Sequence, residues 1–158
     1  MAKAVFLYGS PGVGKTELGN VLIEEKFEGG YRQTTQVKVR EKKGFFGGLK
    51  FVVVDCTGLN HSQNEAKIAE VKKQYDLDNS DCKSVYVFDA NKPSSCDRSD
   101  LDSHKRHTNE FYCLGTHRDK ISSDEYNRWI KELQSSCSVN IFDLTKAPYS
   151  DICSFLGL

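Results

Sequence analysis

The chain has 158 residues, of which 38% are hydrophobic and 28% are charged, a balance that suits a soluble globular protein and excludes a fibrous or disordered one. Lys plus Arg and Asp plus Glu both number 22, so the formal net charge is zero and no basic footprint predicts a nucleic-acid partner. We expect a single domain over residues 1–158, because this length supports one hydrophobic core. No stretch reaches transmembrane length and neither end carries a secretion or lipidation pattern, so we expect a cytoplasmic protein.

Six short runs rich in β-branched and aromatic residues predict six strands. Five of them are continuous apolar runs, as in strands that a parallel sheet buries on both faces. The sixth, residues 35–41, alternates polar and apolar residues and predicts an antiparallel edge strand, which the turn "GFFGG" joins to the next strand. The five apolar runs are residues 4–8, 51–54, 84–88, 110–114 and 139–142.

Helical spacing of apolar residues predicts helices over residues 15–27, 63–75 and 122–136, the last of which begins with a capping box from Ser122 to Glu125. The stretch 91–109 is almost wholly polar and gives no clear prediction. Together the elements predict a three-layer α/β domain with a six-stranded, mostly parallel sheet, one antiparallel edge strand and helices on both faces.

The octapeptide "GSPGVGKT", residues 9–16, lies between the first predicted strand and the first predicted helix. It matches G-x-x-x-x-G-K-[ST], the phosphate-binding P-loop, and its position separates it from a chance glycine turn. Its glycines allow successive backbone N–H groups to point into one concavity, where phosphate oxygens bind. The residues predicted to contact the nucleotide here are Gly9, Ser10, Gly12, Val13, Gly14, Lys15 and Thr16.

Two P-loop side chains carry the charge chemistry. Lys15 supplies a compact positive charge to the β- and γ-phosphates, and the Thr16 hydroxyl is suited to ligate Mg²⁺. Asp55 ends a predicted buried strand forty residues beyond Lys15, where it can hold the same ion, usually through water. Gly58 closes a D-x-x-G pattern, and its backbone N–H is placed to contact a γ-phosphate.

Thr34 lies nineteen residues after Lys15, between the two motifs. A hydroxyl in this loop can reach Mg²⁺ only when a γ-phosphate is present, which predicts a switch. Thr34 is the first choice and Thr35 the second; the alternative is that both threonines simply begin the edge strand. We therefore assign Lys15, Thr34 and Gly58 to catalysis, and Thr16, Thr34 and Asp55 to the metal.

The motif order resembles the small GTPase domain over essentially the whole chain. The run "GTHRD", residues 115–119, follows a predicted strand at the place of that family's N-K-x-D motif. The resemblance implies that Asp119 accepts hydrogen bonds from guanine N1–H and N2–H₂, donors that adenine lacks. The alternative is an incidental loop aspartate. Thr116 and His117 replace the usual Asn and Lys, so we expect weaker contacts to the ribose and the P-loop.

The same resemblance extends to the family's fifth motif, S-A-K. Leu144, Thr145 and Lys146 occupy its place in "IFDLTK". It implies that Thr145 offers a backbone N–H to guanine O6 and that Lys146 lies against the ring.

Within the GTPases, "GKTELGN" and "DCTGL" resemble the AIG1/GIMAP branch, whose P-loop continues with a glycine and an asparagine, here Gly19 and Asn20. A Ras- or Rab-like domain is the competing assignment, because Thr57 replaces the branch's proline and residues 91–109 lack its central box.

Leu59 follows Gly58, where many small GTPases keep a glutamine that orients the attacking water; His61 is the nearest polar residue. We expect slow hydrolysis that depends on an arginine from a partner or from across a nucleotide-dependent homodimer, the pairing that the branch resemblance implies. Arg32, Arg98 and Arg106 are candidates, and the alternative is that each is a solvated surface arginine.

The leading interpretation is a Mg²⁺-dependent GTP/GDP switch that works with regulatory or effector proteins. An ATP-using P-loop kinase or ATPase and a pseudo-GTPase scaffold remain alternatives. Phe45 and Phe46 would suit partner docking if exposed, or would fold back onto the sheet. The run "HKRH", with His104 and His107, predicts a solvated charged face rather than a metal site.

The six cysteines show no C-x-x-C pair and no zinc-ligand spacing to a histidine. We expect them to be reduced, with a disulfide framework as the alternative. They are Cys56, Cys82, Cys96, Cys113, Cys137 and Cys153.

Overall fold

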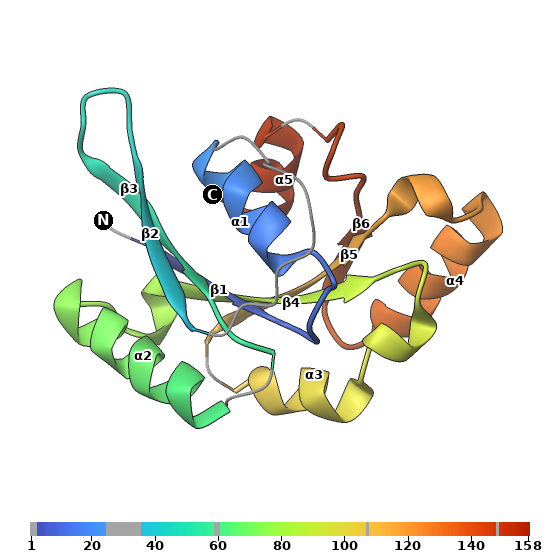
Figure 1. Cartoon of the computed structure of the whole chain (residues 1–158), viewed down its shortest axis with the longest axis horizontal. Helices are drawn as coiled ribbons and strands as arrows, with labels where there is room; N and C mark the ends of the chain where they lie inside the picture. Colours follow the sequence, from blue (N-terminus) through green and yellow to red (C-terminus); the bar gives the residue numbers. More distant parts are fainter. Residues whose placement is uncertain (1–2, 25–35, 59–60, 107, 148) are drawn as a thin grey trace.

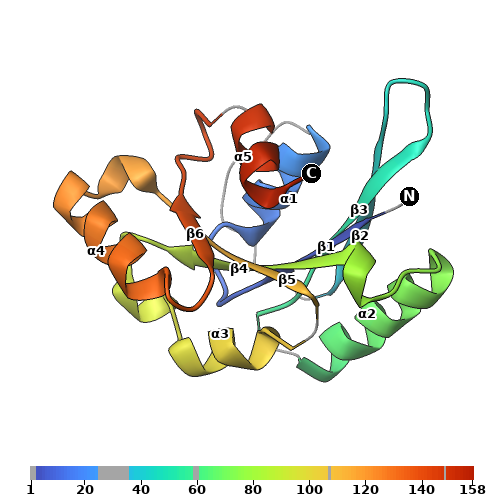
Figure 2. The same ribbon diagram turned by 180° about the vertical axis from the view of Figure 1, so that it is seen from behind.

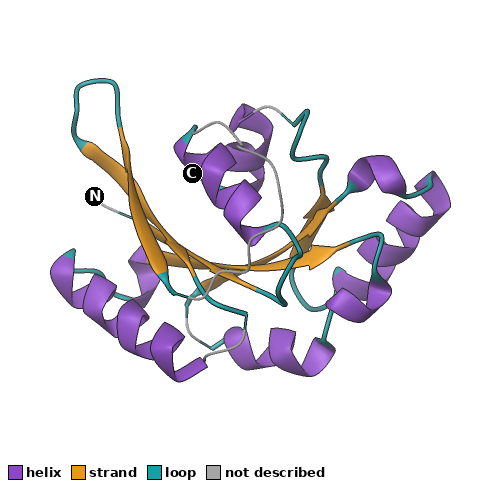
Figure 3. Cartoon of the chain, in the orientation of Figure 1, coloured by secondary structure: helices purple, strands orange, loops and turns teal. Residues whose placement is uncertain are grey.

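A six-stranded sheet lies between two layers of helices in a computed structural model that describes residues 3–24, 36–58, 61–106, 108–147 and 149–158 (Figures 1 and 3). The strand order is β2-β3-β1-β4-β5-β6, with every pair parallel except β2 and β3. The predicted mostly parallel sheet with one antiparallel edge strand is confirmed. The strands are β1 (Ala4–Tyr8), β2 (Lys38–Lys43), β3 (Leu49–Asp55), β4 (Cys82–Asp89), β5 (Glu110–Thr116) and β6 (Ser138–Ile141).

Five α-helices cover the two faces of the sheet in the described part of the chain. α1 and α5 lie on one face, and α2, α3 and α4 lie on the other, as Figures 1 and 2 show from opposite sides. Among the described residues, three short 3-10 helices join the longer elements. The α-helices are α1 (Lys15–Ile23), α2 (His61–Gln74), α3 (Arg98–His104), α4 (Ser123–Leu133) and α5 (Tyr149–Leu156), and the 3-10 helices are η1 (Asn79–Asp81), η2 (Pro93–Ser95) and η3 (Arg118–Lys120).

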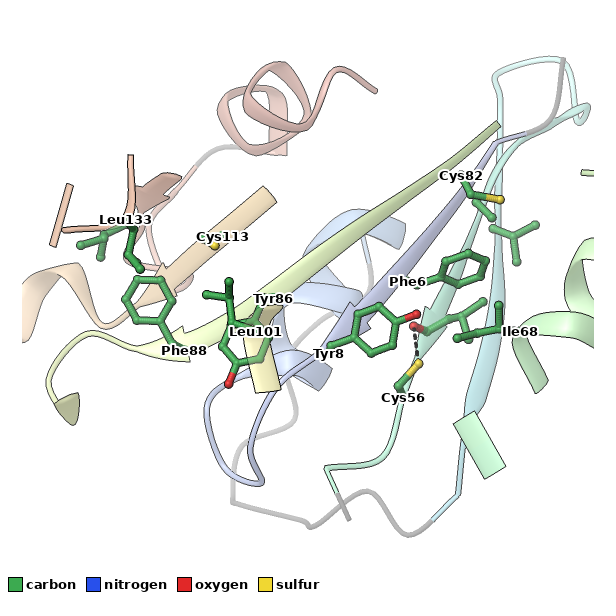
Figure 4. Packing of buried hydrophobic residues seen from close by; sticks show 14 of the residues in the cluster. Phe6, Tyr8, Cys56, Ile68, Cys82, Tyr86, Phe88, Leu101, Cys113 and Leu133 are labelled. Atoms are coloured by element: carbon green, nitrogen blue, oxygen red, sulfur yellow. Dashed lines mark hydrogen bonds between the residues drawn. The ribbon is translucent and has the colours of Figure 1, made fainter. Parts of the chain in front are cut away.

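Alternation along the central strand β1 builds both hydrophobic cores. Val5 and Leu7 point toward α1 and α5, whereas Phe6 and Tyr8 point toward α2 and α3, because successive strand residues face opposite sides. Figure 4 shows the second core, in which Leu101 of α3 packs near the aromatic rings of the sheet. Because both cores pack on β1, they hold in place the carboxyl end of this strand, from which the P-loop begins.

The hairpin between β2 and β3 projects beyond the sheet (Figures 1 and 2). Its turn is closed by hydrogen bonds between Gly44 and Gly48, of 2.7 Å, and between Gly47 and Gly44, of 2.9 Å. Phe45 and Phe46 at its tip are each 97% exposed. Of the two interpretations of these rings, exposure is therefore confirmed and folding back onto the sheet is wrong.

Several boundaries differ from the prediction for identifiable reasons. β2 begins at Lys38, after Gln36 and Val37, and the first residue of the predicted strand, Thr35, lies outside the described residues. α1 ends at Ile23, where Glu24 takes a left-handed conformation (φ 60°) that closes the helix. The capping box of α4 is confirmed, with Ser122 accepting from the backbone N–H of Glu125.

The polar stretch 91–109 contains α3, which the sequence did not predict. Asp97 caps it by accepting hydrogen bonds from the backbone N–H groups of Ser99 and Asp100. His104, at the end of α3, is only 6% exposed because its ring stacks on Tyr8. The expectation of a solvated face at His104 is therefore wrong, and His107 lies outside the described residues.

Cys113 and Cys137 form a disulfide, which corrects the expectation that all six cysteines are reduced. Cys113 lies on β5 and Cys137 immediately precedes β6, the neighbouring strand, so pairing of the two strands brings their Cα atoms to 6.2 Å. The other four cysteines are free. Among the described residues no helix is long and apolar enough to cross a bilayer.

Candidate functional site

The carboxyl ends of parallel strands meet at one edge of the sheet, the usual place for a ligand in an open α/β sheet. β1 leads into the P-loop, and β3 ends at Asp55. β4 ends at Asp89 and β5 at Thr116. The sheet therefore brings the phosphate, metal and base-side candidates together, although they are distant in sequence.

The P-loop adopts a path that its glycines make accessible. Gly9, Gly12 and Gly14 have φ values of 140°, 79° and 105°, which side chains with a Cβ rarely adopt. A Cβ at Gly9 would also lie 2.2 Å from the carbonyl oxygen of Val87 on β4. The loop can therefore pass close to the sheet and open as a cradle at the start of α1, whose dipole favours an anion there.

Lys15 is folded back over the loop that precedes it. Its Nζ donates hydrogen bonds of 2.9 Å to the carbonyl oxygens of both Gly9 and Ser10, and the residue is 5% exposed. Burial lowers the pKa of Lys15, and the nearby Asp55 opposes that shift. The positive charge is thus held at the mouth of the cradle, where phosphate oxygens could replace the two carbonyls.

Asp55 and Thr16 form a hydroxyl–carboxylate pair beside the cradle. Thr16 Oγ1 donates to Asp55 Oδ2 over 2.8 Å, and Asp55 is fully buried. Burial raises the pKa of Asp55, whereas the hydrogen bond from Thr16 and the charges of Lys15 and Arg40 act in the opposite direction.

The second oxygen of Asp55 shows that these residues fit a hard cation. Asp55 Oδ1 is buried and accepts no hydrogen bond from the part of the chain that the structure describes, a costly state for a carboxylate oxygen. A carboxylate with an open lone pair next to a hydroxyl oxygen is a donor set that suits Mg²⁺. Thr34 and Thr35, the proposed switch hydroxyls, lie outside the described residues.

Arg40, which the sequence analysis did not single out, lies against the middle of α1, at Gly19 and Asn20. Its Nη1 donates to Asn20 Oδ1 over 2.6 Å. A Cβ at Gly19 would lie 2.3 Å from Arg40 Nη2, so glycine makes room for the guanidinium. Gly19 and Asn20 thereby hold the Arg40 guanidinium in a position from which its positive charge acts to lower the pKa of Asp55.

Gly58 packs directly on the P-loop. A Cβ there would lie 2.7 Å from Pro11 Cδ and 2.8 Å from the Pro11 backbone nitrogen. The neighbouring Thr57 is held by the buried side chain of Asn64 on α2, which accepts from the Thr57 N–H at 2.8 Å and donates to the Thr57 carbonyl at 2.9 Å. The D-x-x-G segment is therefore fixed between the P-loop and α2, and Leu59 lies outside the described residues.

Thr116 connects the base-side motif to the P-loop. Thr116 is only 1% exposed. Its hydroxyl donates to the carbonyl of Val13 over 2.7 Å, and the carbonyl of Phe88 lies 3.2 Å from the same oxygen. A Cβ at Gly14 would lie only 3.0 Å from Thr116 Cγ2. The contact to the P-loop that we expected to weaken in the absence of Asn is therefore made by the threonine hydroxyl.

His117 has the left-handed backbone conformation, with φ 62°, which is uncommon outside glycine and marks tight functional turns. Its Nδ1 lies 2.9 Å from Thr116 Oγ1 and 3.1 Å from Asp89 Oδ1. Asp89 is buried at the end of β4. The sequence analysis missed Asp89; its signal was an aspartate that ends an apolar strand, the same signal that identified Asp55.

Asp119 lies in η3 with 42% of its side chain exposed, and its Oδ2 is 3.8 Å from Lys120 Nζ. A carboxylate in this position is open to a ligand at the edge of the sheet. The loop after β6 approaches the same turn, because the backbone N–H of Arg118 donates to the Phe142 carbonyl over 3.2 Å.

Thr145 and Lys146 are exposed in that loop. Asp143, which the sequence analysis did not single out, accepts from both the backbone N–H and the hydroxyl of Thr145, over 3.0 and 2.6 Å. These bonds lower the pKa of Asp143. The N–H expected to bind guanine O6 is therefore engaged by Asp143 in this structure.

The arginine candidates for hydrolysis do not converge on the site. Arg98 connects α3 to α4 through the Glu132 carbonyl, at 3.4 Å, and Ser136 Oγ, at 3.1 Å. Arg106 Nε donates to the Ser103 carbonyl on its own helical segment, at 3.4 Å. Both positions fit the surface alternative, and Arg32 lies outside the described residues.

A P-loop after β1, a buried aspartate after β3 and a base-side turn after β5 define the P-loop GTPase class. A comparison with protein families is consistent with this class: residues 4–117 match the 50S ribosome-binding GTPase family. The chain belongs to that family. The matched segment includes the P-loop, the D-x-x-G segment and Thr116, and ends two residues before Asp119. A comparison with curated proteins finds no match.

Proposed function

We propose that this chain is a Mg²⁺-dependent guanine-nucleotide switch that hydrolyses GTP slowly. Family membership supports guanine-nucleotide binding. The observation that carries the metal part of the proposal is the buried Asp55 carboxylate, whose Oδ1 accepts no hydrogen bond from the described residues while Thr16 donates to Oδ2. We also propose that residues 1–158 form one domain that acts in the cytoplasm.

The P-loop residues would bind and orient the phosphates. In this proposal Lys15 exchanges its bonds to the Gly9 and Ser10 carbonyls for bonds to β- and γ-phosphate oxygens. The backbone N–H of Gly58 would meet the γ-phosphate, since Gly58 already packs on Pro11. Thr16 and Asp55 would hold Mg²⁺ together with Thr34, and the ion would neutralise charge on the phosphates.

Guanine selection would rest on Asp119, Thr145 and the turn at His117. Asp119 would accept two hydrogen bonds from guanine, and adenine would leave this carboxylate without a donor. For Thr145 to bind guanine O6, its N–H must leave Asp143. His117 and Lys146 would lie against the base, with Asp89 orienting the imidazole.

Slow hydrolysis follows from Leu59, which stands where many small GTPases keep the water-orienting glutamine. An arginine from a regulatory or effector protein, or from the second copy in a nucleotide-dependent homodimer, would raise the rate. The AIG1/GIMAP branch is our preferred assignment, because its characteristic glycine and asparagine, here Gly19 and Asn20, both contact the Arg40 guanidinium. A Ras- or Rab-like domain is the competitor.

A pseudo-GTPase scaffold is the second candidate. It is favoured by the bonds between Thr145 and Asp143, which satisfy the base-side loop without a ligand. Such a protein would bind partners through its surface, with little or no hydrolysis.

The deciding experiment measures affinities for GDP, a non-hydrolysable GTP analogue and ATP, with Mg²⁺ and with a chelator, on the wild type and on Asp119→Ala. The matched control is Asp124→Ala, which removes another exposed aspartate, at the start of α4. We expect guanine binding that Mg²⁺ strengthens, that falls at least tenfold in Asp119→Ala and that is unchanged in Asp124→Ala. Preference for ATP, or equal guanine binding by both variants, would refute the assignment. No binding by the wild type would favour the scaffold.

A further inference from the structure

Two histidines and an aspartate converge between α2 and α3, in a cluster that the nucleotide proposal does not use. His61 is the first residue of α2, and Asp100 and His104 lie one turn apart on α3. One ligand atom from each of the three lies within 4.8 Å of the other two. We propose that His61, Asp100 and His104 bind a divalent transition-metal ion, with Zn²⁺ as the representative ion.

The chemistry of the three side chains selects the class of ion. Imidazole nitrogen suits Zn²⁺ and its late first-row neighbours, whereas Mg²⁺ and Ca²⁺ take oxygen ligands. Two histidines with one carboxylate are also a known zinc ligand set, and water fills the fourth position of such open sites. At Zn–N and Zn–O bonds of about 2.1 Å, tetrahedral ligands lie roughly 3.4 Å apart. The longest separation between ligand atoms, which is within 4.8 Å, must therefore shorten by about 1.4 Å or less.

Two of the three ligands are already held in place. His104 Nε2 lies 3.3 Å from Asp100 Oδ1, and the two residues share one helix face. The His104 ring is stacked on the Tyr8 ring, with centroids 4.0 Å apart and planes 17° from parallel. A buried, stacked imidazole has few alternative rotamers, so His104 would lose little conformational entropy on binding a metal ion.

His61 supplies the solvent-facing side of the site. It is exposed, and its ring centroid lies 6.0 Å from that of His104. Small rotations of an exposed side chain at the start of a helix can close this distance.

The cluster borders the nucleotide site without belonging to it. Tyr8, which supports His104, directly precedes Gly9 of the P-loop, and His61 follows Gly58 by three residues. A metal ion here would connect the beginning of α2 to α3. Metal binding itself does not require the proposed nucleotide function, so the two can be tested separately.

The test is Zn²⁺ titration of the chain of residues 1–158, freed of metal by chelation and kept in excess Mg²⁺, by competition with a chromophoric chelator. The Cys96→Ser background removes the only free cysteine that is not buried. Co²⁺ provides a second probe, since its visible absorption reports coordination by histidine and carboxylate. Thermal unfolding of each variant checks that it folds.

We expect one Zn²⁺ per chain, and we expect His61→Ala and Asp100→Asn each to weaken its affinity by at least about tenfold, since losing a residue that merely orients a ligand already costs about 10–100-fold. Asp102→Asn, which changes an exposed aspartate of the same helix, should bind as tightly as the parent. His107→Gln is the histidine-matched control. Binding that survives both ligand variants, that is lost in either control, or that is absent from the folded parent overturns the proposal.

Discussion

Thr116 donates a hydrogen bond of 2.7 Å to the carbonyl of Val13 across 103 residues of sequence. The bond joins the end of β5 to the interior of the P-loop, so the base-side and phosphate-side segments are attached to one another directly. A hydroxyl has one proton, and the shorter contact to Val13 takes it in preference to Phe88 at 3.2 Å. The Thr116 hydroxyl therefore bridges β5 and the P-loop at the position where the sequence resemblance places an asparagine.

Replacing Thr116 with valine keeps the shape of the side chain and removes the hydroxyl. We expect Thr116→Val to lower the free energy of unfolding by about 1–2 kcal/mol, because the buried Val13 carbonyl loses its partner. Thr116→Ser keeps the hydroxyl and should recover most of this loss. Urea unfolding of the three proteins measures it, and equal stability of the valine variant and the wild type would show that the bond contributes nothing.

Gly58→Ala should weaken nucleotide binding. The added Cβ meets both Pro11 Cδ and the Pro11 backbone nitrogen at 2.7 and 2.8 Å, so the clash cannot be relieved by a side-chain rotation. We expect at least a tenfold loss of affinity for a GTP analogue. Gly48→Ala is the control, because a Cβ there has no atom within 4 Å, and it should bind normally. If both variants bind alike, Gly58 does not constrain the P-loop.

Glu110 supports a buried lysine and makes stability depend on pH. Lys83 is 6% exposed and forms an ion pair with Glu110, which also accepts from the Tyr112 hydroxyl over 2.9 Å. The hydrogen bonds from Lys83 and Tyr112 lower the pKa of Glu110. A carboxyl whose pKa is lowered by folding stabilises the fold above its unfolded pKa of about 4.3 and loses that effect as pH falls through the folded value.

Glu110→Gln should therefore destabilise the protein at pH 7 and have a diminishing effect as the pH falls below about 4.3. The size is about 1 kcal/mol or less, because the Glu110 side chain is 49% exposed and solvent screens the pair. Melting temperatures of the wild type and Glu110→Gln, measured from pH 7 to below about pH 4, give the difference in stability at each pH. Glu132→Gln, an exposed change on α4, should leave the melting temperature unchanged at every pH. A Glu110→Gln gap that stays constant down to acid pH would contradict the ion-pair explanation.

The disulfide between Cys113 and Cys137 closes a sequence separation of 24 residues. Loop-closure entropy then predicts a contribution of about 3 kcal/mol, so Cys137→Ser and reduction should each lower the melting temperature. Thiol titration of the denatured chain should find four free thiols without reductant and six with it, in accord with the four free cysteines. Six thiols in the untreated protein would contradict the bond.

Features with a local pattern were predictable from the sequence. The P-loop is defined by eight consecutive residues, and β1 and β4 are continuous apolar runs. Asp55 stood out because a carboxylate follows a buried strand. The mostly parallel sheet also followed from the alternation of apolar strand runs with helices, whereas the order of its strands did not. Each of these needed only neighbouring residues to be recognised.

Features created by long-range contacts were not predictable in this way. Asn64 is one polar residue of a charged helix, and its role appears only where the fold brings it to Thr57. α3 has few apolar residues, with Leu101 packed in the core, so periodicity could not reveal it. The disulfide depends on the pairing of β5 with β6. The sequence alone does not show which of these distant residues become neighbours in the fold.

The exposed aromatic tip of the β2–β3 hairpin has a mechanical consequence. β3 runs without interruption from Leu49, beside that tip, to Asp55 at the opposite edge of the sheet, a length of roughly 20 Å for seven extended residues. β2 runs alongside it, with Lys38 opposite Asp55. A partner that binds Phe45 and Phe46 would therefore contact one end of a continuous strand whose other end carries the proposed magnesium ligand, Asp55. A displacement of the hairpin by such a partner would shift Asp55 relative to the P-loop.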